Sequence, residues 1–376
     1  MDSSNWPSSA SLLAPLAPWF NRCRRELPWR ARALDQRHPD PYAVLVSELM
    51  LQQTQVATVI PYLQRWMERF PTPRDLALAT EDQVHKAWEG LGYYRRARHL
   101  QASAQAISEQ GWPTNLAGLQ ELPGLGPYTA AAVASIAFQW PEPALDGNAF
   151  RVLARLLALA GDPKIHAPTL RTWLRPGLEA LGPSRLTQAL MELGATVCGG
   201  NPRCEACPVA SGCKARLQGL QAVIPPPAKR AAPKRQELIL LALERDGRFL
   251  VRPPAGKGLL AGLWTWPSLP RLSVQNFAAE ASMPYGVEVR TWPGWTQVYT
   301  HRREEVEPFH VRLEISVPTP EGTVWKPFED LPQLPMGNRD ARLRTLLATP
   351  GQPPVLPMDP RFWLATLSEP GAIPAR

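Results

Sequence analysis

Four of the chain's five cysteines lie close together, between positions 198 and 213. Four thiolates at such short spacing can converge on one metal centre without a large fold to bring them together. The spacing alone does not decide between zinc and an iron–sulfur cluster. Disulfide bonds are a weaker interpretation, because nothing in the chain points to an oxidising compartment. The four candidate ligands are Cys198, Cys204, Cys207 and Cys213.

Glu48 is the first carboxylate that could do chemistry. It stands in a nearly unbroken apolar run over 43–51, where a carboxyl would be partly desolvated and its pKa raised. A carboxyl that keeps its proton near neutral pH can act as a general acid. The alternative is a glutamate on a thin polar stripe with Gln52 and Gln55. This segment alone favours that simpler interpretation.

Asp146 is the second carboxylate, and it precedes an expected helix over 149–159. Helix capping explains an aspartate at this place without any chemistry, and it is the favoured interpretation for the segment alone. The alternative is an ionised carboxylate aimed at a developing cation. Paired with a protonated Glu48, it would suit cleavage of a glycosidic bond through an oxocarbenium-like state. An N-glycosidic bond in DNA is broken by the same logic once the base is flipped out.

Three segments suggest contacts with DNA. Segment 122–130 contains Gly124 and Gly126, which allow a tight turn and a close approach of backbone amides to a phosphate. A plain helix–helix turn is the alternative there. Base flipping also needs side chains that fill the gap, and segments 52–54 and 90–96 offer polar and aromatic ones with arginines nearby. The tyrosines of the last segment could equally belong to a core.

Composition limits the class of protein. At 376 residues with 44% hydrophobic content, the chain is long enough for about two domains with real cores. Its net charge of +8 favours a polyanionic partner. No apolar run reaches the roughly 18 residues of a membrane span. Apolar residues 12–20 are followed rather than preceded by arginines, the wrong order for a signal peptide. We expect an ordinary first helix there, no membrane partner and a reducing cytoplasm.

The elements that must position these residues fall into two halves. From 41 to about 216 the pattern is helical, with breaks at proline and glycine. Residues 224–235 carry four prolines and four Lys or Arg residues, which predicts a stiff charged connector. Beyond it the pattern predicts an α+β half with a tight turn at Asp246-Gly247. The expected strands are 238–243, 249–252, 287–292, 297–300, 310–317 and 323–326, and the expected helices are 274–281 and 339–347.

Longer runs carry a family resemblance. Segments 47–62, 88–94 and 145–148, together with the glycine turn and the cysteine loop, resemble the helix-hairpin-helix DNA glycosylases with an iron–sulfur cluster, specifically the MutY-type adenine DNA glycosylases. The resemblance is dense from Leu27 to Cys213 and looser beyond. It implies a multi-domain protein with an all-α helix-hairpin-helix glycosylase domain, an iron–sulfur cluster loop and a C-terminal α+β Nudix-like domain.

The resemblance also implies domain boundaries. The expected parts are a helical catalytic region 1–218 (six-helix barrel about 30–137; cluster subdomain about 8–29 and 138–218), a proline-rich basic linker 219–236, a Nudix-like domain 237–348 that recognises 8-oxoguanine, and a proline-rich tail 349–376, expected to be poorly ordered.

Site roles follow from the same resemblance. Glu48 would protonate adenine on its imidazole-ring nitrogen and later help to position water, and Asp146 would stabilise or trap the sugar cation. Tyr128 and Asn148 would complete the pocket around them, and the cysteines would hold one structural [4Fe–4S] cluster. The residues implied in DNA or base binding are Arg30, Gln53, Thr54, Leu91, Tyr93, Gly124, Gly126, Thr300 and His301.

The implied activity is removal of adenine from mispairs with 8-oxoguanine or guanine in double-stranded DNA, by a monomer in the cytoplasm and associated with the nucleoid. Lyase-competent relatives carry a lysine where this chain has Tyr128, and its amine forms a Schiff base with the sugar. Tyrosine cannot, so hydrolysis without strand scission is expected. The alternatives are a bifunctional glycosylase/lyase for oxidised pyrimidines and a non-catalytic iron–sulfur protein that binds DNA.

Two departures from the family pattern stand out. Cys198 and Cys204 have five residues between them, where the family usually has six. The run 299–301 (Tyr-Thr-His) matches the family's aromatic-x-His signature with Tyr for Phe and Thr for Ser, and an extra charged stretch over 302–308 follows. The expected helix over 274–281 offers only Glu280, too few glutamates for the magnesium site of a true Nudix hydrolase. Recognition is therefore the expected role of this half.

Overall fold

The computed structural model describes residues 6–30, 39–227, 232–271, 287–299, 301–313, 319–351 and 353. The chain divides into two compact units: the first is Met1–Ala79 with Arg96–Lys229, and the second is Thr80–Arg95 with Arg230–Arg376. The chain thus passes from the first unit to the second within the segment where the sequence predicts a linker. Residues 80–95, which the sequence places in the helical region, group with the second unit.

The first unit is helical throughout its described residues. Its α-helices are α1 (Ser9–Leu13), α2 (Leu16–Cys23), α3 (Pro41–Leu51), α4 (Val56–Arg69), α5 (Pro73–Leu78), α7 (Arg95–Gln110), α8 (Leu116–Glu121), α9 (Pro127–Phe138), α10 (Gly147–Leu157), α11 (Ala167–Leu181), α12 (Pro183–Thr196) and α13 (Lys214–Leu217). Its 3-10 helices are η2 (Pro28–Arg30), η3 (Pro163–His166), η4 (Cys204–Ala206) and η5 (Ala210–Gly212).

The predicted single first helix over 12–20 is wrong. Two helices occupy this stretch, and they meet at Ala14 and Pro15, where Pro15 is the N-cap of α2. Proline has no amide hydrogen to donate to the preceding turn, so a helix that reaches it ends or bends there.

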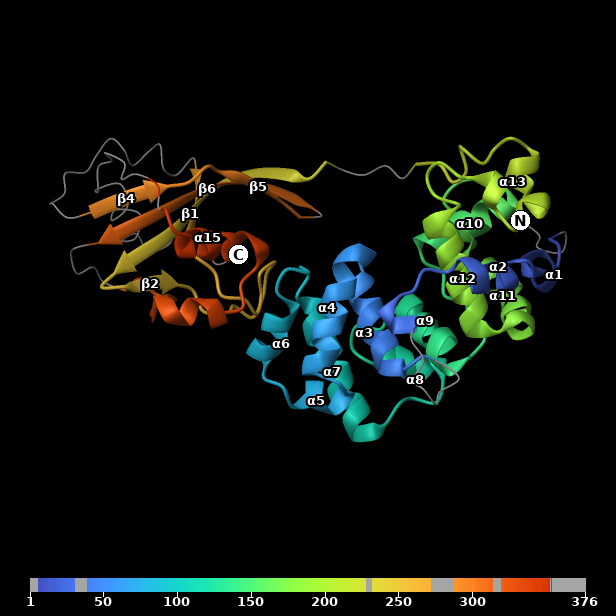
Figure 1. Ribbon diagram of the computed structural model, residues 1–376, viewed down its shortest axis with the longest axis horizontal. Coiled ribbons are helices and arrows are strands. Elements are labelled where there is room, and N and C mark those ends of the chain that lie inside the picture. The colour runs from blue at the N-terminus through green and yellow to red at the C-terminus, as the bar shows by residue number, and fades with distance from the viewer. Residues whose placement is uncertain are drawn as a thin grey trace. The chain divides into compact units, whose positions relative to one another are not determined.

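Helix α9 forms the centre of the first unit, and α3, α8 and α12 pack against it (Figure 1). Every residue from Thr129 to Ala137 is buried, and most are alanine, valine or serine. Such small side chains let neighbouring helices approach closely on several sides. Because α9 begins just before Tyr128 and α3 carries Glu48, this packing brings the two side chains toward the same interior.

A second core lies under the cysteine loop. Leucine-rich faces of α1, α2, α10, α11 and α12 share it, and Cys198, Cys207 and Cys213 pack against its edge. Helix α10 starts one residue after Asp146, and it packs on both α12 and α13. The same helix therefore supports the start of the pocket segment and the cysteine loop.

The second unit is built on a mixed sheet. Its strands are β1 (Lys234–Arg245), β2 (Arg248–Val251), β3 (Ser268–Pro270), β4 (Val287–Thr291), β5 (Trp295–Val298), β6 (Arg302–Leu313) and β7 (Val324–Pro327), and its helices are α6 (Glu81–Trp88), η6 (Phe328–Gln333) and α15 (Asn338–Ala348). The sheet order is β4-β6-β1-β2-β7, with β3 beside β1 and β5 beside β6. Only the β1–β6 pair among these is parallel.

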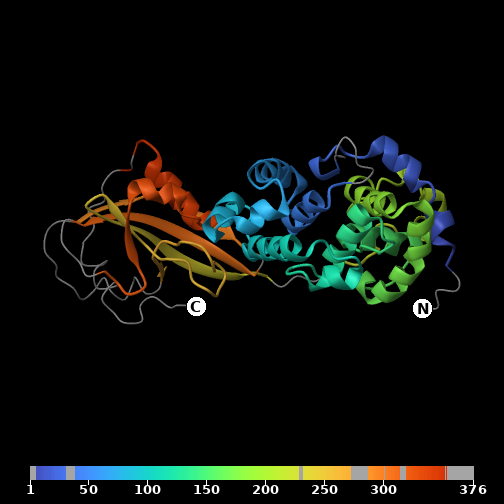
Figure 2. The same ribbon diagram turned by 90° about the horizontal axis from the view of Figure 1, so that it is seen from below.

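The predicted hairpin is confirmed. Strands β1 and β2 are joined at Asp246 and Gly247, which both have positive φ (52° and 69°), as the turn types of tight hairpins require. On one face of the sheet Leu240 and Val251 pack with Leu343 and Leu347 of α15, which lies along that face (Figures 1 and 2). A second apolar cluster covers the other face.

The charged stretch 302–308 forms part of a strand, which the sequence did not predict. It is the first half of β6 and pairs with β1 from Lys234↔Arg302 through Leu240↔Pro308. Its alternating residues are buried, including Glu304, whose carboxylate lies within ion-pair distance of Arg302 and Arg339. Ion pairing lets charged residues take inward strand positions, which hides the strand pattern in the sequence.

Other expectations differ in detail. Strand β5 ends at Val298, two residues before the predicted end, and β3 was not predicted. The expected helix 274–281 with Glu280, and almost all of the proline-rich tail, lie outside the described residues. None of the helices in the part of the chain that the structure describes is long and apolar enough to cross a membrane.

Candidate active site

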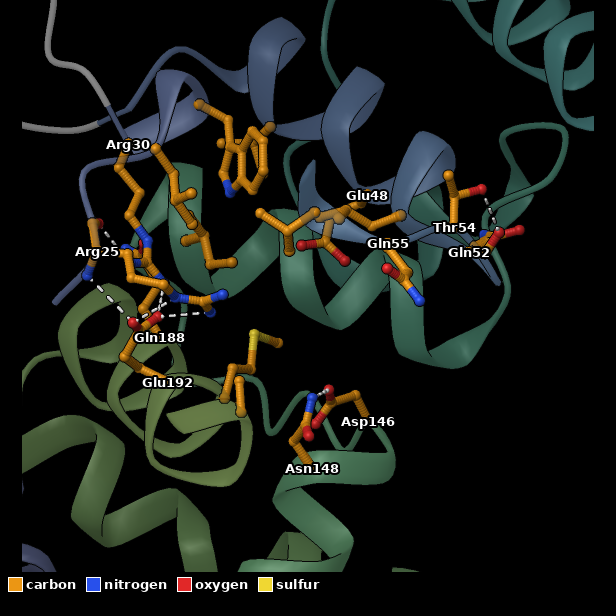
Figure 3. A pocket seen from close by; sticks show the side chains of 18 of the residues that line it. Arg25, Arg30, Glu48, Gln52, Thr54, Gln55, Asp146, Asn148, Gln188 and Glu192 are labelled. Carbon is orange, nitrogen blue, oxygen red and sulfur yellow. Dashed lines mark hydrogen bonds and ion pairs between the residues drawn. The ribbon is translucent and has the colours of Figure 1, made fainter. Parts of the chain in front are cut away.

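A cavity of about 540 Å³ opens in the first unit, a size common for small-molecule sites. It is lined from α3, α9, α12 and the segment before α10. Figure 3 shows Glu48 on one side of this cavity, and Asp146 and Asn148 on the other. The lining residues named from the sequence are Arg30, Glu48, Thr54, Tyr128, Asp146 and Asn148. The two carboxylates predicted to act together therefore face one hollow.

Glu48 is a buried acid that accepts a hydrogen bond from Tyr128. Asp40 caps the start of α3 by accepting hydrogen bonds from Tyr42 and Ala43, and the apolar helix then carries Glu48 inside, where it is 6% exposed. The Tyr128 hydroxyl donates a hydrogen bond to Glu48 Oε2 over 2.8 Å. Burial raises the pKa of Glu48 to about 7, and the hydrogen bond from Tyr128 opposes this rise. The carboxyl is thus poised to hold or release a proton near neutral pH.

We expect the pKa of Glu48 to rise above about 7 when Tyr128 is replaced by phenylalanine. The phenol hydrogen bond stabilises the ionised carboxylate, so its loss favours the protonated form. A pH titration of glutamate side-chain carboxyls by ¹³C NMR measures the shift. Tyr42→Phe is the matched control, because the Tyr42 hydroxyl bonds Trp66. An unchanged or lower pKa in Tyr128→Phe would contradict the expected role of this hydrogen bond.

Asp146 is a helix cap, as predicted, and it also lines the cavity. Its side chain caps α10, accepting from the Ala149 amide over 2.6 Å, and it also accepts from the Asn148 side-chain amide over 2.8 Å. Burial raises the pKa of Asp146, while these donors and the charge of Arg151 oppose the rise. The donors stabilise the negative form. A helix cap that also lines the cavity can present a carboxylate to a cation formed there.

Arg151 fixes the orientation of Asn148. Its guanidinium donates to Asn148 Oδ1 over 2.7 Å and to the Gly194 carbonyl over 2.8 Å. With its oxygen engaged in this way, the Asn148 amide turns its NH₂ group to Asp146. The Nε atom of Arg151 also donates to the Cys198 carbonyl over 2.8 Å. One side chain therefore connects the pocket with the cysteine loop.

Two arginines and a glutamate form another wall of the cavity (Figure 3). The carboxylate of Glu192 is fully buried and receives Arg25 Nε over 2.7 Å and Arg30 over 2.8 Å. Burial alone would raise the pKa of Glu192, but the hydrogen bonds from Arg25 and Arg30 outweigh it and lower the pKa. The sequence analysis missed Arg25 and Glu192. A glutamate among apolar residues of α12 was a signal of the same kind as that of Glu48.

The turn after α3 carries the next predicted residues. Gln53 is exposed and has a positive φ of 58°, a backbone conformation that is uncommon for residues with a side chain. Thr54 lines the cavity, and its amide donates to the Leu51 carbonyl over 3.3 Å. Gln52 donates to the Thr129 hydroxyl over 3.3 Å. The turn thus presents Gln53 outward at the edge of the cavity.

The predicted helix-hairpin-helix is α8, a short turn and α9. Gly124 has a φ of 81°, and a Cβ there would lie 2.6 Å from a His99 side-chain carbon, so glycine is required for the fold. Gly126 caps α9 without a side-chain hydrogen bond, and a Cβ there would meet no atom within 4 Å. The first amides of α9 have no intrahelical acceptor. The turn offers open backbone donors of the kind that bind phosphate.

The four clustered cysteines line one small cavity of about 20 Å³ between α10 and the loop after α12. All are free thiols. Buried Arg155 donates to the Gly199 carbonyl over 2.6 Å, to the Gly200 carbonyl over 3.3 Å and to Cys198 Sγ over 3.3 Å. The shortened loop after Cys198 is therefore held from α10. Among the described residues, no group of three or more His, Cys, Asp or Glu side chains is arranged to hold a metal ion.

The remaining predicted residues belong to the second unit. Leu91 is 6% exposed, whereas Tyr93 is 42% exposed, so of these two only Tyr93 presents a large surface. In the aromatic-x-His run, the Tyr299 amide donates to the Arg302 carbonyl over 2.7 Å, and exposed His301 follows at the start of β6. Thr300 lies outside the described residues.

Comparison with known proteins agrees with this geometry. Residues 46–176 match the model of the HhH-GPD superfamily base excision DNA repair proteins. The chain is 37% identical over 361 residues to an adenine DNA glycosylase from Homo sapiens, covering 80% of this chain and 65% of that protein. It is 41% identical over 212 residues to one from Mycobacterium tuberculosis (54% and 66%). It is 28% identical over 397 residues to one from Schizosaccharomyces pombe (85% and 86%).

The human, Arabidopsis, rat and mouse relatives are longer proteins, and the chain spans 46% to 65% of their length. The predicted arrangement of a helical glycosylase domain and a further domain with a mixed sheet is confirmed. The matched region holds Glu48, Tyr128, Asp146 and the helix-hairpin-helix. Residues 46–176 thus match the HhH-GPD superfamily of base excision DNA repair proteins, and over longer stretches the chain is similar to adenine DNA glycosylases.

Proposed function

We propose that this protein is a monofunctional adenine DNA glycosylase of base excision repair, which hydrolyses the N-glycosidic bond of adenine mispaired with 8-oxoguanine or guanine. The observation that carries the proposal is one cavity lined by a buried acid with a pKa of about 7 and by a hydrogen-bonded aspartate. The names of the relatives, all adenine DNA glycosylases, support the choice of base.

Glu48 supplies the proton. With a pKa of about 7, a large fraction of this carboxyl is protonated at neutral pH. The flipped adenine enters the cavity, Glu48 gives its proton to the imidazole ring, and the electrons of the glycosidic bond move to the base as the bond breaks. Tyr128 keeps the carboxyl in place through its 2.8 Å hydrogen bond. The rate is expected to fall as pH rises above about 7, because the acid is then ionised.

Asp146 stabilises the sugar cation left by the departing base. The amides of Ala149 and Asn148 hold its carboxylate in one orientation, so little reorganisation is needed when the positive charge develops. Water then attacks the cation and passes its proton to the ionised Glu48. Because burial raises the pKa of Asp146, the rate should begin to fall on the acid side at a pH above the ordinary pKa of an aspartate. The profile is therefore bell-shaped.

The test uses a duplex with one adenine opposite 8-oxoguanine. We expect cleavage at the adenine only after incubation with the protein and heating in alkali, because hydrolysis leaves an alkali-labile abasic site. Tyr128 has no amine for a Schiff base with the sugar. Strand breaks before alkali, or efficient trapping of the protein on DNA by borohydride, would show lyase activity instead. Mispair binding with no base release would show a non-catalytic binding protein.

The cysteine loop fits an iron–sulfur cluster. Four free thiols line one cavity, which suits a [4Fe–4S] cluster with one thiolate to each iron. When bound, the cluster would supply structure and no redox step. Arg155 would hold the first part of the loop around it.

Purified protein should contain about four iron atoms and four sulfide ions per chain. Replacing Cys207 by serine should remove the cluster, and mispair affinity should fall by about tenfold or more, because the loop loses its anchor. Iron and sulfide analysis, with a DNA-binding titration, gives both results. Cys23→Ser is the matched control, since Cys23 is exposed and apart from the other four. Zinc in place of iron would contradict the assignment.

The second unit is proposed to be Nudix-like and to recognise 8-oxoguanine. Its support is the mixed sheet with α15 on one face and the Tyr299–His301 run between β5 and β6. The exposed His301 directly precedes β6, where its side chain is available to a base or phosphate. His301→Ala should remove the proposed contact between the second unit and the DNA. The protein should then still release adenine, but it should discriminate less between adenine opposite 8-oxoguanine and adenine opposite guanine.

A further inference from the structure

The inference concerns Arg96, a buried arginine in the first turn of α7. It is 7% exposed, and its side chain reaches the end of α3, the helix that carries Glu48. One of its terminal nitrogens lies 2.8 Å from the Leu49 carbonyl, 2.9 Å from the Met50 carbonyl and 2.6 Å from the Gln52 carbonyl. Its other terminal nitrogen lies 3.4 Å from the Thr54 hydroxyl.

These acceptors are the ones that a helix leaves without partners. The last carbonyls of an α-helix have no intrahelical donor, and they form the negative end of the helix dipole. A buried guanidinium satisfies several carbonyls at once and places a positive charge where that dipole favours it. Arg96 thus closes the end of α3 from outside the helix, within one turn of Glu48.

The closed end also fixes the turn that follows. The chain leaves α3 at Gln52, turns through the positive φ of Gln53 and re-enters a helix at Val56. The positive φ is a strained choice for glutamine, so it persists only where the surroundings impose it. The Arg96 side chain supplies that restraint. It contacts the carbonyls of Met50 and Gln52 and the hydroxyl of Thr54.

We propose that Arg96 is a positioning residue, which holds the turn 52–54 so that Gln53 projects into the gap left by the flipped base while Glu48 stays at the cavity. This inference rests on the proposed function. It adds to that function a residue that does not itself line the cavity. Arg96 acts through the backbone of α3 and its turn.

The test compares Arg96→Met, Arg96→Lys and the double variant Arg96→Met/Gln53→Ala with the unaltered full chain. On a duplex with adenine opposite 8-oxoguanine, single-turnover adenine release should be about tenfold slower in Arg96→Met, because small displacements in a positioned site are costly. Arg96→Lys should recover part of the rate, since a lysine keeps the positive charge but lacks the several planar N–H donors of a guanidinium. Arg175→Met is the control, because Arg175 lies on α11, pairs with Glu142 and does not line the cavity.

Two readouts separate positioning from simple loss of stability. In a protein that already carries Gln53→Ala, Arg96→Met should slow adenine release by much less than tenfold, because the effect of Arg96 on the rate passes through Gln53. Hydrogen exchange at the Thr54 amide, which donates to the Leu51 carbonyl, should become faster in Arg96→Met and remain slow in Arg175→Met.

An unchanged rate of adenine release in Arg96→Met would overturn the proposal. So would a double variant whose loss of rate is the product of the two single losses, or unchanged hydrogen exchange at the Thr54 amide. If Arg96→Met fails to fold, the same comparisons are made with Arg96→Lys, which retains the charge at the end of α3. If the unaltered protein releases no adenine, the proposed function fails, and the exchange measurement still decides whether Arg96 holds the turn.

Discussion

Glu48→Gln is expected to slow adenine release by about a thousandfold, because an amide has no proton acidic enough to give to the base. The glutamine side chain matches the shape of the protonated carboxyl, so the cavity and the Tyr128 contact should persist. Binding of the mispaired duplex should therefore stay within a few-fold of the unaltered protein. Single-turnover release and a binding titration measure the two effects separately.

The same variant should be more stable than the unaltered protein at alkaline pH. Glu48 has a pKa near 7 in the folded state against an ordinary value of 4.5, so its ionisation opposes folding as pH rises through this range. At pH 8 the neutral glutamine avoids that cost, which is of the order of 3 kcal/mol. Denaturant unfolding at pH 8 and pH 4 checks this, and the two proteins should converge at pH 4.

Glu179→Gln provides the control, because Glu179 is an exposed residue of α11. It should change neither the rate nor the pH dependence of stability. A Glu48→Gln protein that releases adenine at a rate close to that of the unaltered chain would remove the general acid from the mechanism. A variant that is inactive but also less stable at pH 8 would show that ionised Glu48 stabilises the fold, which contradicts a pKa raised by burial.

Sequence reasoning named Glu48 as a candidate because its signal is local, although the segment alone favoured a glutamate on a polar stripe, and the structure shows that the side chain is buried. A carboxylate inside a run of apolar residues must be buried if the run forms a core helix, and burial determines its pKa. The cap role of Asp146 was equally local. That both residues line one cavity depends on the packing of α3, α9 and α10, and the family motifs, rather than periodicity, predicted this convergence.

The wall made by Arg25, Arg30 and Glu192 could not be derived in the same way. Arg25 and Glu192 are 167 positions apart in the chain, and only the fold brings them together. A buried glutamate in α12 could have been suspected, but its partners could not be named. The first half of β6 escaped prediction for a related reason, since Glu304 is buried through ion pairs that the local pattern does not reveal.

The two carboxylates differ in how the fold treats them. Glu48 receives one hydrogen bond, from a neutral phenol, so burial dominates and the proton is retained near neutral pH. Burial raises the pKa of Asp146 as well, but a backbone amide, a side-chain amide and the nearby charge of Arg151 all oppose this rise and favour its negative form. An acid and an anion can therefore face the same cavity, which is the division of labour that glycosidic cleavage requires.

Asp146→Asn tests the anion alone and is expected to slow adenine release by about a thousandfold, because the developing cation loses its fixed negative partner. Asparagine is as good a helix cap as aspartate and can still accept from the Ala149 amide. Its NH₂ group, however, meets the NH₂ of Asn148, which Arg151 holds in place. The variant should therefore lose only about 1 kcal/mol of unfolding free energy.

Asp162→Asn is the matched control, because Asp162 caps η3 through the Lys164 amide and lies outside the cavity. It carries the same chemical change at the same kind of position, and it should leave adenine release unaltered. Single-turnover rates and denaturant unfolding of both variants give the comparison. If Asp146→Asn keeps its rate within tenfold of the unaltered protein, Asp146 is only a cap. If its rate falls by much more than tenfold while it loses no more than about 1 kcal/mol of unfolding free energy relative to Asp162→Asn, the carboxylate charge itself lowers the barrier.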